Sequence, residues 1–595
     1  MSRKRKGYVP RVRGTFINNQ SSKLKSRQTK VQQKKSTKES TKVKNSIPIE
    51  KYNTTVNLFA SRCRRRKTGC TMAKISKYHI LESGNTGEDI CQKILNTDIG
   101  LRIYYKNLNF SAVMPRLSQV FEEFKNRHNR FNYLKKLKYI IARDSNKYAE
   151  QKYKNQIHRR SLQSFFNLLL HENVPLKLFG TTKNFKAIKA TICRLLRTVP
   201  KSKLITKAFK RTVRRKNAIG ASLDMLPLFN KFDISNIEWL HSIKNNAVQW
   251  IIVIKLLHWF FAQYIIKILH KYVVLISIKS QWVYITKDDW CKMQEEFIKE
   301  KINTCGLVPW TPVKIDELKF NIPIGTYKFI PSSSGVRPLL IAKYNIKKKF
   351  DDVDVVLRFL QQLYVTHFNE NGIPTIESCI EAIYKFKAST NNRYYVLCDI
   401  QDAFGSIIQE KLYNIITACC RQLQRSYIVV RTYTISKNKK KKETVQFLPQ
   451  YLKKAINEKA VMNKRKPMLV GLRKLVAKIN KLIFEHKVKL DSQIYSIKHG
   501  VPQGMRISPI LSDIYYQNMF KEKFSVYANN GLLCTYVDDI LYITENEHYA
   551  AEFLEVIKNG IPEYNVKFNP SKIQSNIGLP YKSTRIKFLG WNIKL

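Results

Sequence analysis

The chain has 595 residues, which allows several domains because a single hydrophobic core usually stops growing at about 250 to 300 residues. Hydrophobic residues make up 44% of the sequence, so the composition excludes a protein that is disordered throughout. Lysine and arginine number 107 against 43 acidic residues, and the net charge of +64 favours a nucleic-acid partner. On charge alone, a ribosomal-type protein or a lysine-biased genome explains the composition as well as a nucleic-acid enzyme does.

The first 60 residues are expected to form a basic, disordered tail. Up to about residue 50 the only acidic residues are Glu39 and Glu50, and the apolar residues show almost no periodic pattern. The tail starts with the basic cluster Arg3–Lys6 and lacks the apolar core of a signal peptide, so secretion is not expected. The eleven cysteines include no pair of CxxC knuckles at zinc-binding spacing.

Residues 61–300 are expected to form a mostly helical domain. Apolar residues recur at spacings of three and four in this region, as in Ser161–Leu170 and Phe185–Leu196. The most apolar stretch, Trp250–Ile278, is interrupted by lysines and never reaches the roughly 20 apolar residues that a membrane span needs. We interpret this stretch as a buried helix and expect no membrane partner.

Residues 301–595 are expected to alternate short strands with helices, as in an α/β or α+β body. The predicted strands are runs of β-branched and aromatic residues: Gly325–Ile330, Tyr394–Ile400, Gln493–Lys498, Leu533–Thr544 and Ile586–Ile593. A lysine-rich run, Lys437–Lys442, indicates an exposed insertion between two of the strands.

Three aspartates are the predicted catalytic residues. Asp538 and Asp539 lie between two β-rich runs, a pattern typical of a hairpin with carboxylates at its tip, and Asp399 ends an upstream apolar strand. Transfer of a nucleotide to a 3′-hydroxyl uses two divalent ions about 3.5 to 4 Å apart, and magnesium prefers hard oxygen ligands. An Asp-Asp pair by itself is more often a surface turn, so the prediction depends on the whole constellation.

A glycine-containing block, His499–Tyr516, lies between the two aspartate-bearing strands. Its glycines allow the backbone to approach a ligand closely, and the apolar run after Ser508 predicts a helix beneath the template and the incoming nucleotide. With this block the chain resembles the reverse transcriptases. Cys398–Phe404 resembles their motif A, Val501–Gly504 their motif B′ and Tyr536–Asp539 their motif C.

Three more blocks resemble reverse-transcriptase motifs, in the order that the family has them. Lys328–Leu339 resembles motifs 1 and 2 of the fingers, Asn569–Lys572 resembles motif D, and Lys587–Asn592 resembles the primer-grip motif E. The resemblance therefore covers about Phe320–Leu595 and implies a right-hand α+β palm with fingers.

The resemblance also implies roles for individual residues. Asp399, Asp538 and Asp539 would be catalytic and would hold two Mg²⁺ ions. The residues implied to bind the nucleotide are Lys328, Arg337, Ile400, Phe404, Gln503, Gly504 and Lys572. The last of these could protonate the leaving pyrophosphate. Gly590 and Trp591 would form the primer grip.

Phe404 has two interpretations. The family's aromatic residue at this place lies under the sugar of the incoming nucleotide and blocks a 2′-hydroxyl, which would make Phe404 a sugar gate. A phenylalanine near a helix start is, however, more commonly a core residue. Both interpretations stay open at the level of the sequence.

Among reverse transcriptases, the chain resembles the telomerase catalytic subunit, and in particular the short insect type. Val174–Phe185 is similar to a block of the helical telomerase RNA-binding domain, and Trp282–Trp290 is similar to its T motif. The residues implied to contact RNA are Phe179, Gly180, Asn184, Trp282 and Trp290. An insertion in the fingers, here at about 416–492, is a further telomerase trait.

The sequence departs from the family pattern in several places. Ser332 stands where a lysine is frequent, and Met505 and Arg506 replace the small residue that usually follows Pro-Gln-Gly. No amino-terminal domain of the kind that grips single-stranded DNA is recognisable. The chain stops shortly after motif E, so the helical thumb is expected to be missing, either because it was lost or because the sequence is incomplete.

Together these features predict an RNA-directed DNA polymerase, a nucleotidyltransferase that extends a DNA 3′ end with telomeric repeats copied from a bound RNA. The implied partners are the telomerase RNA template, a single-stranded DNA primer and deoxynucleoside triphosphates, and the implied location is the nucleus, at chromosome ends. A retroelement or intron-type reverse transcriptase shares every palm motif and is the first alternative. A non-catalytic RNA-binding scaffold with a decayed polymerase fold is the second.

Overall fold

A computed structural model describes most of the two regions that the sequence predicts to fold. The described residues are 84–97, 110–148, 151–197, 222–278, 281–311, 322–342, 352–368, 374–387, 393–437, 440–446, 468–578 and 585–594, with the short pieces 55–57, 81, 201–202, 219–220, 320 and 460–462. The predicted basic tail lies outside the described residues, apart from the short strand β1 (Thr55–Asn57), which pairs with β4 (Ser222–Asp224).

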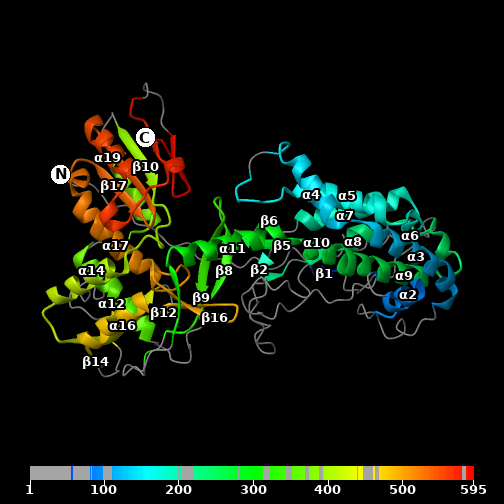
Figure 1. The fold of residues 1–595 in the computed structure, drawn as a ribbon, viewed down its shortest axis with the longest axis horizontal. Coiled ribbons are helices and arrows are strands. Elements are labelled where there is room, and N and C mark those ends of the chain that lie inside the picture. Colours follow the sequence, from blue (N-terminus) through cyan, green and yellow to red (C-terminus); the bar gives the residue numbers. More distant parts are fainter. Residues whose placement is uncertain are drawn as a thin grey trace, which may run out of the picture.

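The first lobe is mostly helical, as predicted (Figure 1). Its helices are α2 (Gly87–Leu95), α3 (Met114–Arg130), α4 (Tyr133–Asp144), α5 (Arg159–Asn173), α6 (Leu176–Phe179), α7 (Thr182–Arg197), α8 (Leu226–Phe229), α9 (Asn246–Trp259), the π-helical segment η5 (Phe260–Ile265) and α10 (Ile266–Tyr272). One continuous hydrophobic core joins them. The apolar residues at spacings of three and four form the buried face of each amphipathic helix.

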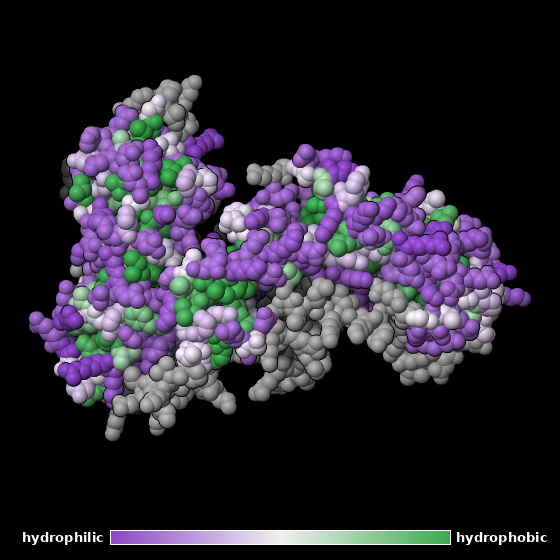
Figure 2. All heavy atoms as spheres, viewed as in Figure 1, coloured by the Kyte–Doolittle hydropathy of each residue, from purple (hydrophilic) through white to green (hydrophobic). Residues whose placement is uncertain are grey.

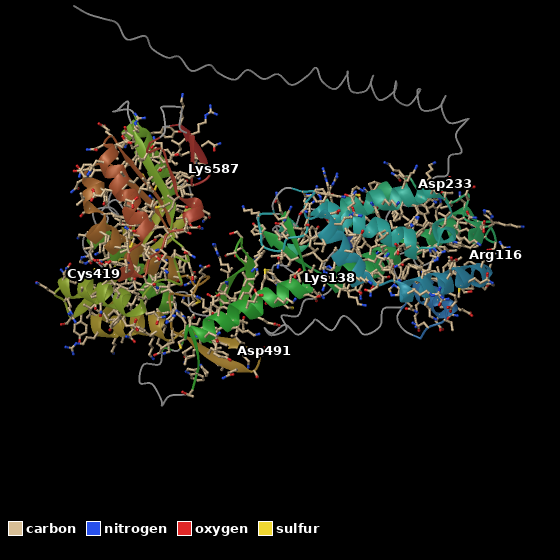
Figure 3. The ribbon with its side chains drawn as sticks, turned by 45° about the horizontal axis from the view of Figure 1, so that its top comes forward. Arg116, Lys138, Asp233, Cys419, Asp491 and Lys587 are labelled. Atoms are coloured by element: carbon tan, nitrogen blue, oxygen red, sulfur yellow. The ribbon has the colours of Figure 1, made fainter. Side chains whose placement is uncertain are left out.

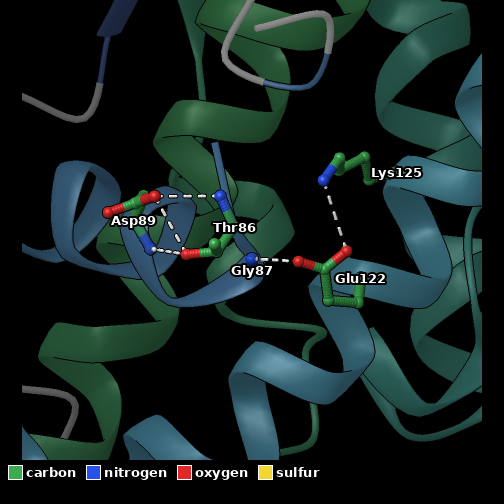
Figure 4. A network of polar contacts seen from close by, with 5 residues as sticks. All are labelled: Thr86, Gly87, Asp89, Glu122 and Lys125. Atoms are coloured by element: carbon green, nitrogen blue, oxygen red, sulfur yellow. Dashed lines mark hydrogen bonds and ion pairs between the residues drawn. The ribbon is translucent and has the colours of Figure 1, made fainter. Parts of the chain in front are cut away.

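Helix α2 shows how local sequence fixes an element and its neighbour (Figure 4). The Thr86 hydroxyl accepts a hydrogen bond from the Asp89 backbone N–H at 3.2 Å, and the Asp89 carboxylate accepts one from the Thr86 N–H at 2.9 Å. This reciprocal capping box starts the helix. A Cβ at Gly87 would lie 2.2 Å from the Ser118 carbonyl oxygen, so only glycine lets α2 pack this closely on α3.

The apolar stretch near the end of this lobe is a buried helix, as predicted, but a shorter one. Among the described residues, Asn246–Tyr272 is long and apolar enough to cross a membrane by length and composition, and most of it is buried inside the protein. The face of this lobe in Figure 2 is mostly hydrophilic. Buried Lys255 donates to the Leu95 carbonyl, which satisfies a charge inside the core. The last residues, Val273–Ile278, form strand β5, so the prediction of helix was wrong there because a run of β-branched residues pairs in a hairpin.

A hairpin and one long helix connect the two lobes. Strand β5 pairs with β6 (Gln281–Thr286), and α11 (Lys287–Asn303) follows directly. Lys138 of α4, labelled in Figure 3, forms an ion pair with Asp288 at 3.1 Å and so ties the start of α11 to the first lobe. Helix α11 then extends to the second lobe (Figure 1).

The second lobe is an α+β body, as predicted. Its palm sheet has the strand order β17-β18-β10-β19. These strands are β17 (Leu532–Tyr536), β18 (Asp539–Thr544), β10 (Tyr394–Asp399) and β19 (Gln574–Ser575). The helices of this lobe are α12 (Asp352–His367), α13 (Ile376–Lys387), α14 (Gln409–Gln422), α16 (Leu472–Phe484), α17 (Ser508–Lys523), α18 (Ser525–Asn529) and α19 (Glu547–Asn559).

The palm sheet is buried on both faces because alternate residues of each strand point to opposite sides. Val396 and Cys398 of β10 belong to the large core with α17 and α19, whereas Tyr395 and Leu397 belong to a smaller core with α13. The hairpin of β20 (Arg585–Phe588) and β21 (Trp591–Lys594) closes the smaller core. Burial on both faces holds the ends of these strands in fixed positions.

The fingers consist of a hairpin, a small sheet and the insertion. Their strands are β7 (Leu307–Pro309), β8 (Thr326–Pro331), β9 (Val336–Ile341), β15 (Lys487–Leu490) and β16 (Gln493–Ile497). The insertion forms a separate sheet of β11 (Tyr427–Lys437), β12 (Lys440–Gln446), β13 (Ala460–Met462) and β14 (Met468–Gly471). The lysine-rich run lies where β11 turns into β12.

Candidate active site

The three predicted catalytic aspartates lie together at one edge of the palm sheet. Asp399 is the last residue of β10 and pairs directly with Asp539, the first residue of β18. Asp538 occupies the turn between β17 and β18, and its carbonyl accepts a hydrogen bond from the Ile400 N–H at 3.0 Å. Val537 in this turn has a φ of 57°, a conformation that is strained for a β-branched residue. The sheet thus brings together side chains that are far apart in sequence.

The carboxylates repel one another in a partly dry environment. Burial, and then the neighbouring Asp399 charge, raises the pKa of Asp538, whereas Lys572 and Arg337 act in the opposite direction. Burial and the charges of Asp538 and Asp399 raise the pKa of Asp539 to about 6. A group of acids that raise each other's pKa values is a concentrated negative site, which a cation would stabilise.

Lys572 is the internal counter-ion of this site. It lies in a short 3₁₀ turn, Pro570–Lys572, and its ammonium is 2.7 Å from a carboxylate oxygen of Asp399. The backbone N–H of Asn569 donates to the Asp399 carbonyl at 2.9 Å, which anchors the turn beside the strand. Motif D and motif A, which the resemblance separated by more than a hundred positions, are therefore in direct contact.

The donor set suits hard divalent ions, although no group of three or more His, Cys, Asp or Glu side chains in the described ranges is already arranged as a metal site. Asp399, Asp538 and Asp539 supply only oxygen ligands, which magnesium prefers to nitrogen or sulfur. Burial, and then the charges of neighbouring carboxylates, raises the pKa values of Asp538 and Asp539, and a divalent cation would relieve that repulsion. On chemistry and electrostatics, these residues fit the ions that the sequence implies.

The fingers hairpin presents two cations on one face. Lys328 of β8 pairs with Leu339, and Ile330 pairs with Arg337 of β9, so Lys328 and Arg337 are diagonal neighbours on the same side of the hairpin. Both side chains are exposed. The Arg337 charge acts on the carboxyl of Asp538. This face therefore places positive charge near the aspartates.

The motif B′ loop is attached to the same hairpin. The Leu340 N–H donates to the Gln503 carbonyl at 2.7 Å. Gly504 has a φ of 94°, and a Cβ there would lie 3.0 Å from the Leu340 carbonyl oxygen. Glycine is therefore required for this loop to lie against β9. The structure thus brings Gln503 and Gly504 next to the strand that carries Arg337.

The other two motif A residues lie deeper than the resemblance implies. Ile400 is 2% exposed and pairs with Phe568, so its side chain packs in the core. The buried side chain of Ile400 is thus not available to a nucleotide in this structure, and a nucleotide contact by Ile400 stays a prediction. Phe404 is partly buried against the same core, and its carbonyl accepts from the Val501 N–H at 2.8 Å. Its position leaves both the sugar-gate and the core interpretation open.

The departures from the family pattern have local explanations. Met505 is 5% exposed and fills part of the palm core. Arg506 forms an ion pair with Asp354 of α12. Ser332 closes the tip of the β8–β9 hairpin, and its carbonyl accepts a hydrogen bond from the Lys154 N–H of the first lobe at 3.0 Å. The tip of the fingers is thereby joined to the helical lobe.

The predicted primer grip is a short hairpin that packs on the same face of the palm sheet as α13. Gly590 has a φ of 87° in the turn between β20 and β21, and Trp591 is 52% exposed next to it. Ile586 and Phe588 are buried against the palm sheet, while Lys587 between them points outward (Figure 3). An exposed tryptophan on a firmly seated hairpin is suited to contact a nucleic acid.

The Val174–Phe185 block has a structural role that the sequence did not reveal. Phe179 and Asn184 are fully buried, and a Cβ at Gly180 would lie 2.7 Å from the Asn236 carbonyl oxygen. The Asn184 amide donates to the carbonyls of Phe179 and Asp233, at 2.8 and 2.6 Å, and accepts from the Asp233 N–H at 2.8 Å. The side chains of Phe179 and Asn184 therefore have a structural role inside the core, and an RNA contact by this block stays a prediction.

The two predicted RNA-binding tryptophans have intermediate exposure. Trp282 lies on β6 opposite Ser277, and Trp290 of α11 packs against a small core with Met293. A partly exposed ring can pack on one face and stack on the other. An RNA contact by these residues stays a prediction.

Sequence reasoning missed one pair near the site. Asp402 lies in the turn after Asp399, and an oxygen of its carboxylate is 3.8 Å from the Lys301 ammonium at the end of α11. Asp402 could have been suspected from its place within motif A. Lys301 carried no signal, because it lies before the fingers in sequence and only the packing of α11 brings it to the palm.

The chain is similar to known proteins over most of its length. Residues 333–593 match the family model for reverse transcriptase (RNA-dependent DNA polymerase). The telomerase reverse transcriptase of Rattus norvegicus is 22% identical over 470 residues, which cover 69% of this chain and 40% of the rat protein. That of Euplotes aediculatus is 20% identical over 549 residues, which cover 80% of this chain and 50% of the ciliate protein. The chain thus spans half or less of the length of these relatives.

Solved telomerase structures share the fold. Telomerase of Candida tropicalis in complex with a TWJ fragment of telomeric RNA matches with a TM-score of 0.52 and 16% identity, over 85% of this chain and 75% of the other. The apo form truncated from its C-terminal domain matches with a TM-score of 0.51 and 16% identity, over 85% of this chain and 93% of the other. The family match, these likenesses and the aspartate site agree: the chain is similar to telomerase reverse transcriptases over most of its length, and residues 333–593 form a reverse-transcriptase domain.

Proposed function

We propose that the chain is an RNA-directed DNA polymerase that extends a DNA 3′ end by copying a bound telomerase RNA, and that it adds telomeric repeats at chromosome ends in the nucleus. The observation that supports this most strongly is the assembly of Asp399, Asp538 and Asp539 at one end of the two central palm strands, where the Arg337 charge of the fingers acts on Asp538. The likeness to telomerase reverse transcriptases favours a telomeric substrate over other DNA ends.

The proposed reaction joins the 3′-hydroxyl oxygen of the primer to the α-phosphorus of a deoxynucleoside triphosphate and releases pyrophosphate. When bound by the three aspartates, two Mg²⁺ ions would supply an acidified hydroxyl and charge neutralisation on the phosphates. Arg337 and Lys328 would hold the triphosphate from the fingers. Gly504 would let the backbone approach the nucleotide closely.

Lys572 has two successive roles in this proposal. In the structure its ammonium neutralises Asp399 at 2.7 Å. Binding of a cation by Asp399 would weaken that pair, because both positive charges compete for one carboxylate. The released ammonium could then donate a proton to the leaving pyrophosphate.

The helical lobe is proposed to hold the RNA. Its exposed basic residues would contact phosphates, and partly exposed aromatic residues such as Trp282 and Trp290 would stack on unpaired bases. The contact between Ser332 and Lys154 would keep the RNA-holding lobe in register with the fingers.

A decisive experiment purifies the chain with its copurifying RNA, sequences that RNA and measures extension of a telomeric primer. We expect a short template complementary to the added repeat, and ribonuclease treatment should abolish extension. A chain that ignores its bound RNA but copies any added RNA would support the retroelement or intron-type alternative. A chain that binds RNA and extends no primer on any template would support the scaffold alternative.

A further inference from the structure

We propose that Lys301 is an additional phosphate-binding residue of the nucleotide site, and that Asp402 holds it in position until a triphosphate takes over. This inference rests on the proposed polymerase function, which it deepens. It assigns a ligand contact to α11, the helix that leads out of the helical lobe.

Packing of α11 on the fingers fixes where Lys301 lies. The Phe297 ring contacts the rings of Tyr327 and Phe329 of β8, with centroids 6.3 and 5.7 Å apart. Lys301 follows Phe297 by one helical turn, and its ammonium is 5.8 Å from the Phe297 ring centroid. Residues four apart share a helix face, so Lys301 lies on the face that packs against the hairpin. Its ammonium is thereby directed to the palm.

The partner of Lys301 is an exposed carboxylate beside the catalytic strand. Asp402 comes three positions after Asp399 and has a φ of 47°. Its carbonyl accepts hydrogen bonds from the N–H groups of Gly405 and Ser406 at 2.8 and 2.9 Å, which hold the turn. The side chain of Asp402 is 54% exposed, and an oxygen of its carboxylate is 3.8 Å from the Lys301 ammonium.

A second cation acts on the same carboxylate. Burial raises the pKa of Asp402, whereas the positive charges of Lys301 and Arg337 act in the opposite direction. Arg337 also acts on Asp538, so its charge reaches both Asp402 and a catalytic aspartate. Two cations from separate elements therefore share one anion at the edge of the site.

The Lys301–Asp402 ion pair is weak, which argues against a purely structural role. The Lys301 and Asp402 side chains are 29% and 54% exposed, and a partly exposed ion pair at this distance contributes about 1 kcal/mol because water screens the charges. A triphosphate carries several negative charges and more acceptor oxygens than one carboxylate, so it would compete successfully for both cations. The long, flexible stem of a lysine would allow its ammonium to move from Asp402 to a phosphate.

The test measures primer extension and nucleotide binding with the full chain and its bound RNA. Lys301→Ala should raise the KM for deoxynucleoside triphosphate roughly ten-fold, as expected for the loss of one charged hydrogen bond, and change kcat by less than about two-fold. Lys301→Arg should restore most of the lost affinity. Lys299→Ala removes an exposed lysine from the opposite side of the same helix and should leave KM unchanged.

Asp402→Asn tests the holding role, since asparagine tolerates the left-handed backbone at this position. Removing the competing anion should lower the KM for the nucleotide. A rise or no change in KM would overturn the role of Asp402. A fall in kcat for Lys301→Ala at unchanged KM, or a lack of rescue by arginine, would overturn the role of Lys301.

Equilibrium binding of dTTP with Ca²⁺, measured without turnover, separates this inference from the proposed function. Weaker dTTP binding by Lys301→Ala than by the unmodified chain supports the phosphate contact even if no primer is extended. Unmodified chain that binds dTTP but never extends a primer contradicts the proposed function alone. Equal dTTP affinity of the two proteins, at equal melting temperatures, contradicts the phosphate contact.

Discussion

Two regions resemble functional motifs: the aspartate site of the palm and the Val174–Phe185 block of the helical lobe. The polar side chains of the two regions have opposite environments. In the helical block the Asn184 amide makes three hydrogen bonds to backbone groups within the core. In the palm, burial and then the charges of neighbouring carboxylates raise the pKa values of Asp538 and Asp539. Polar groups satisfied inside the protein maintain a fold, whereas groups left in mutual repulsion are available to a ligand.

The backbone shows the same contrast. The positive φ in the helical block belongs to Gly180, which adopts 80° without steric cost. The positive φ in the catalytic turn belongs to Val537, at 57°, although a β-branched residue resists that conformation. Stored strain of this kind is expected where the fold must place a side chain for chemistry rather than for stability.

The largest effect that tests this contrast is expected from Asp538→Asn. The substitution keeps the size of the side chain but removes a charged oxygen ligand, so primer extension should fall by roughly a thousand-fold or more. Binding of the RNA and the melting temperature should change little. Asp491→Asn, in the exposed β15–β16 turn labelled in Figure 3, is the matched control and should keep full activity. Extension by Asp538→Asn at the rate of this control would refute the catalytic assignment.

A smaller effect, on stability instead of chemistry, is expected from Asn184→Ala. The change leaves buried groups of Phe179 and Asp233 without their partner, which should lower the free energy of unfolding by about 3 kcal/mol. Chemical denaturation of the full chain measures this, with exposed Asn230→Ala as the control. RNA affinity should be unchanged at a temperature where the variant is fully folded. A folded variant with weakened RNA binding would restore Asn184 as an RNA contact.

The smallest effect is expected from Phe404→Ala, because Phe404 lies between the catalytic site and the buried core. If Phe404 is a sugar gate, Phe404→Ala should keep deoxynucleotide use and gain ribonucleotide incorporation, with roughly a ten-fold loss of discrimination. If it is a core residue, the variant should lose about 3 kcal/mol of stability and all activity together. Relative incorporation of the two sugars, measured alongside a melting curve, distinguishes these outcomes. An unchanged sugar preference in a well-folded variant would rule out the gate.

Much of the architecture could be predicted from local patterns. The period of the apolar residues predicted the helical first lobe, and short β-branched runs predicted β8, β10, β16 and the β17–β18 hairpin. The prediction of helix was wrong at Val273–Ile278. A continuous apolar run has the same pattern in a buried helix and in a buried strand, so the sequence of the run cannot distinguish them. The partner strand, β6, decides between them.

The sequence by itself determined which residues have the chemistry for the reaction, because Asp399, Asp538 and Asp539 stand in motifs whose order and residue types carry that information locally. Only the tertiary structure decided which side chains are placed where they can take part in that reaction. The side chains of Ile400, Phe179 and Asn184 are buried. Packing brought Lys301 and Lys572 to carboxylates distant in sequence. The exposure of a side chain and its distance from other side chains depend on how separate elements pack, and a local pattern of residues does not specify that packing.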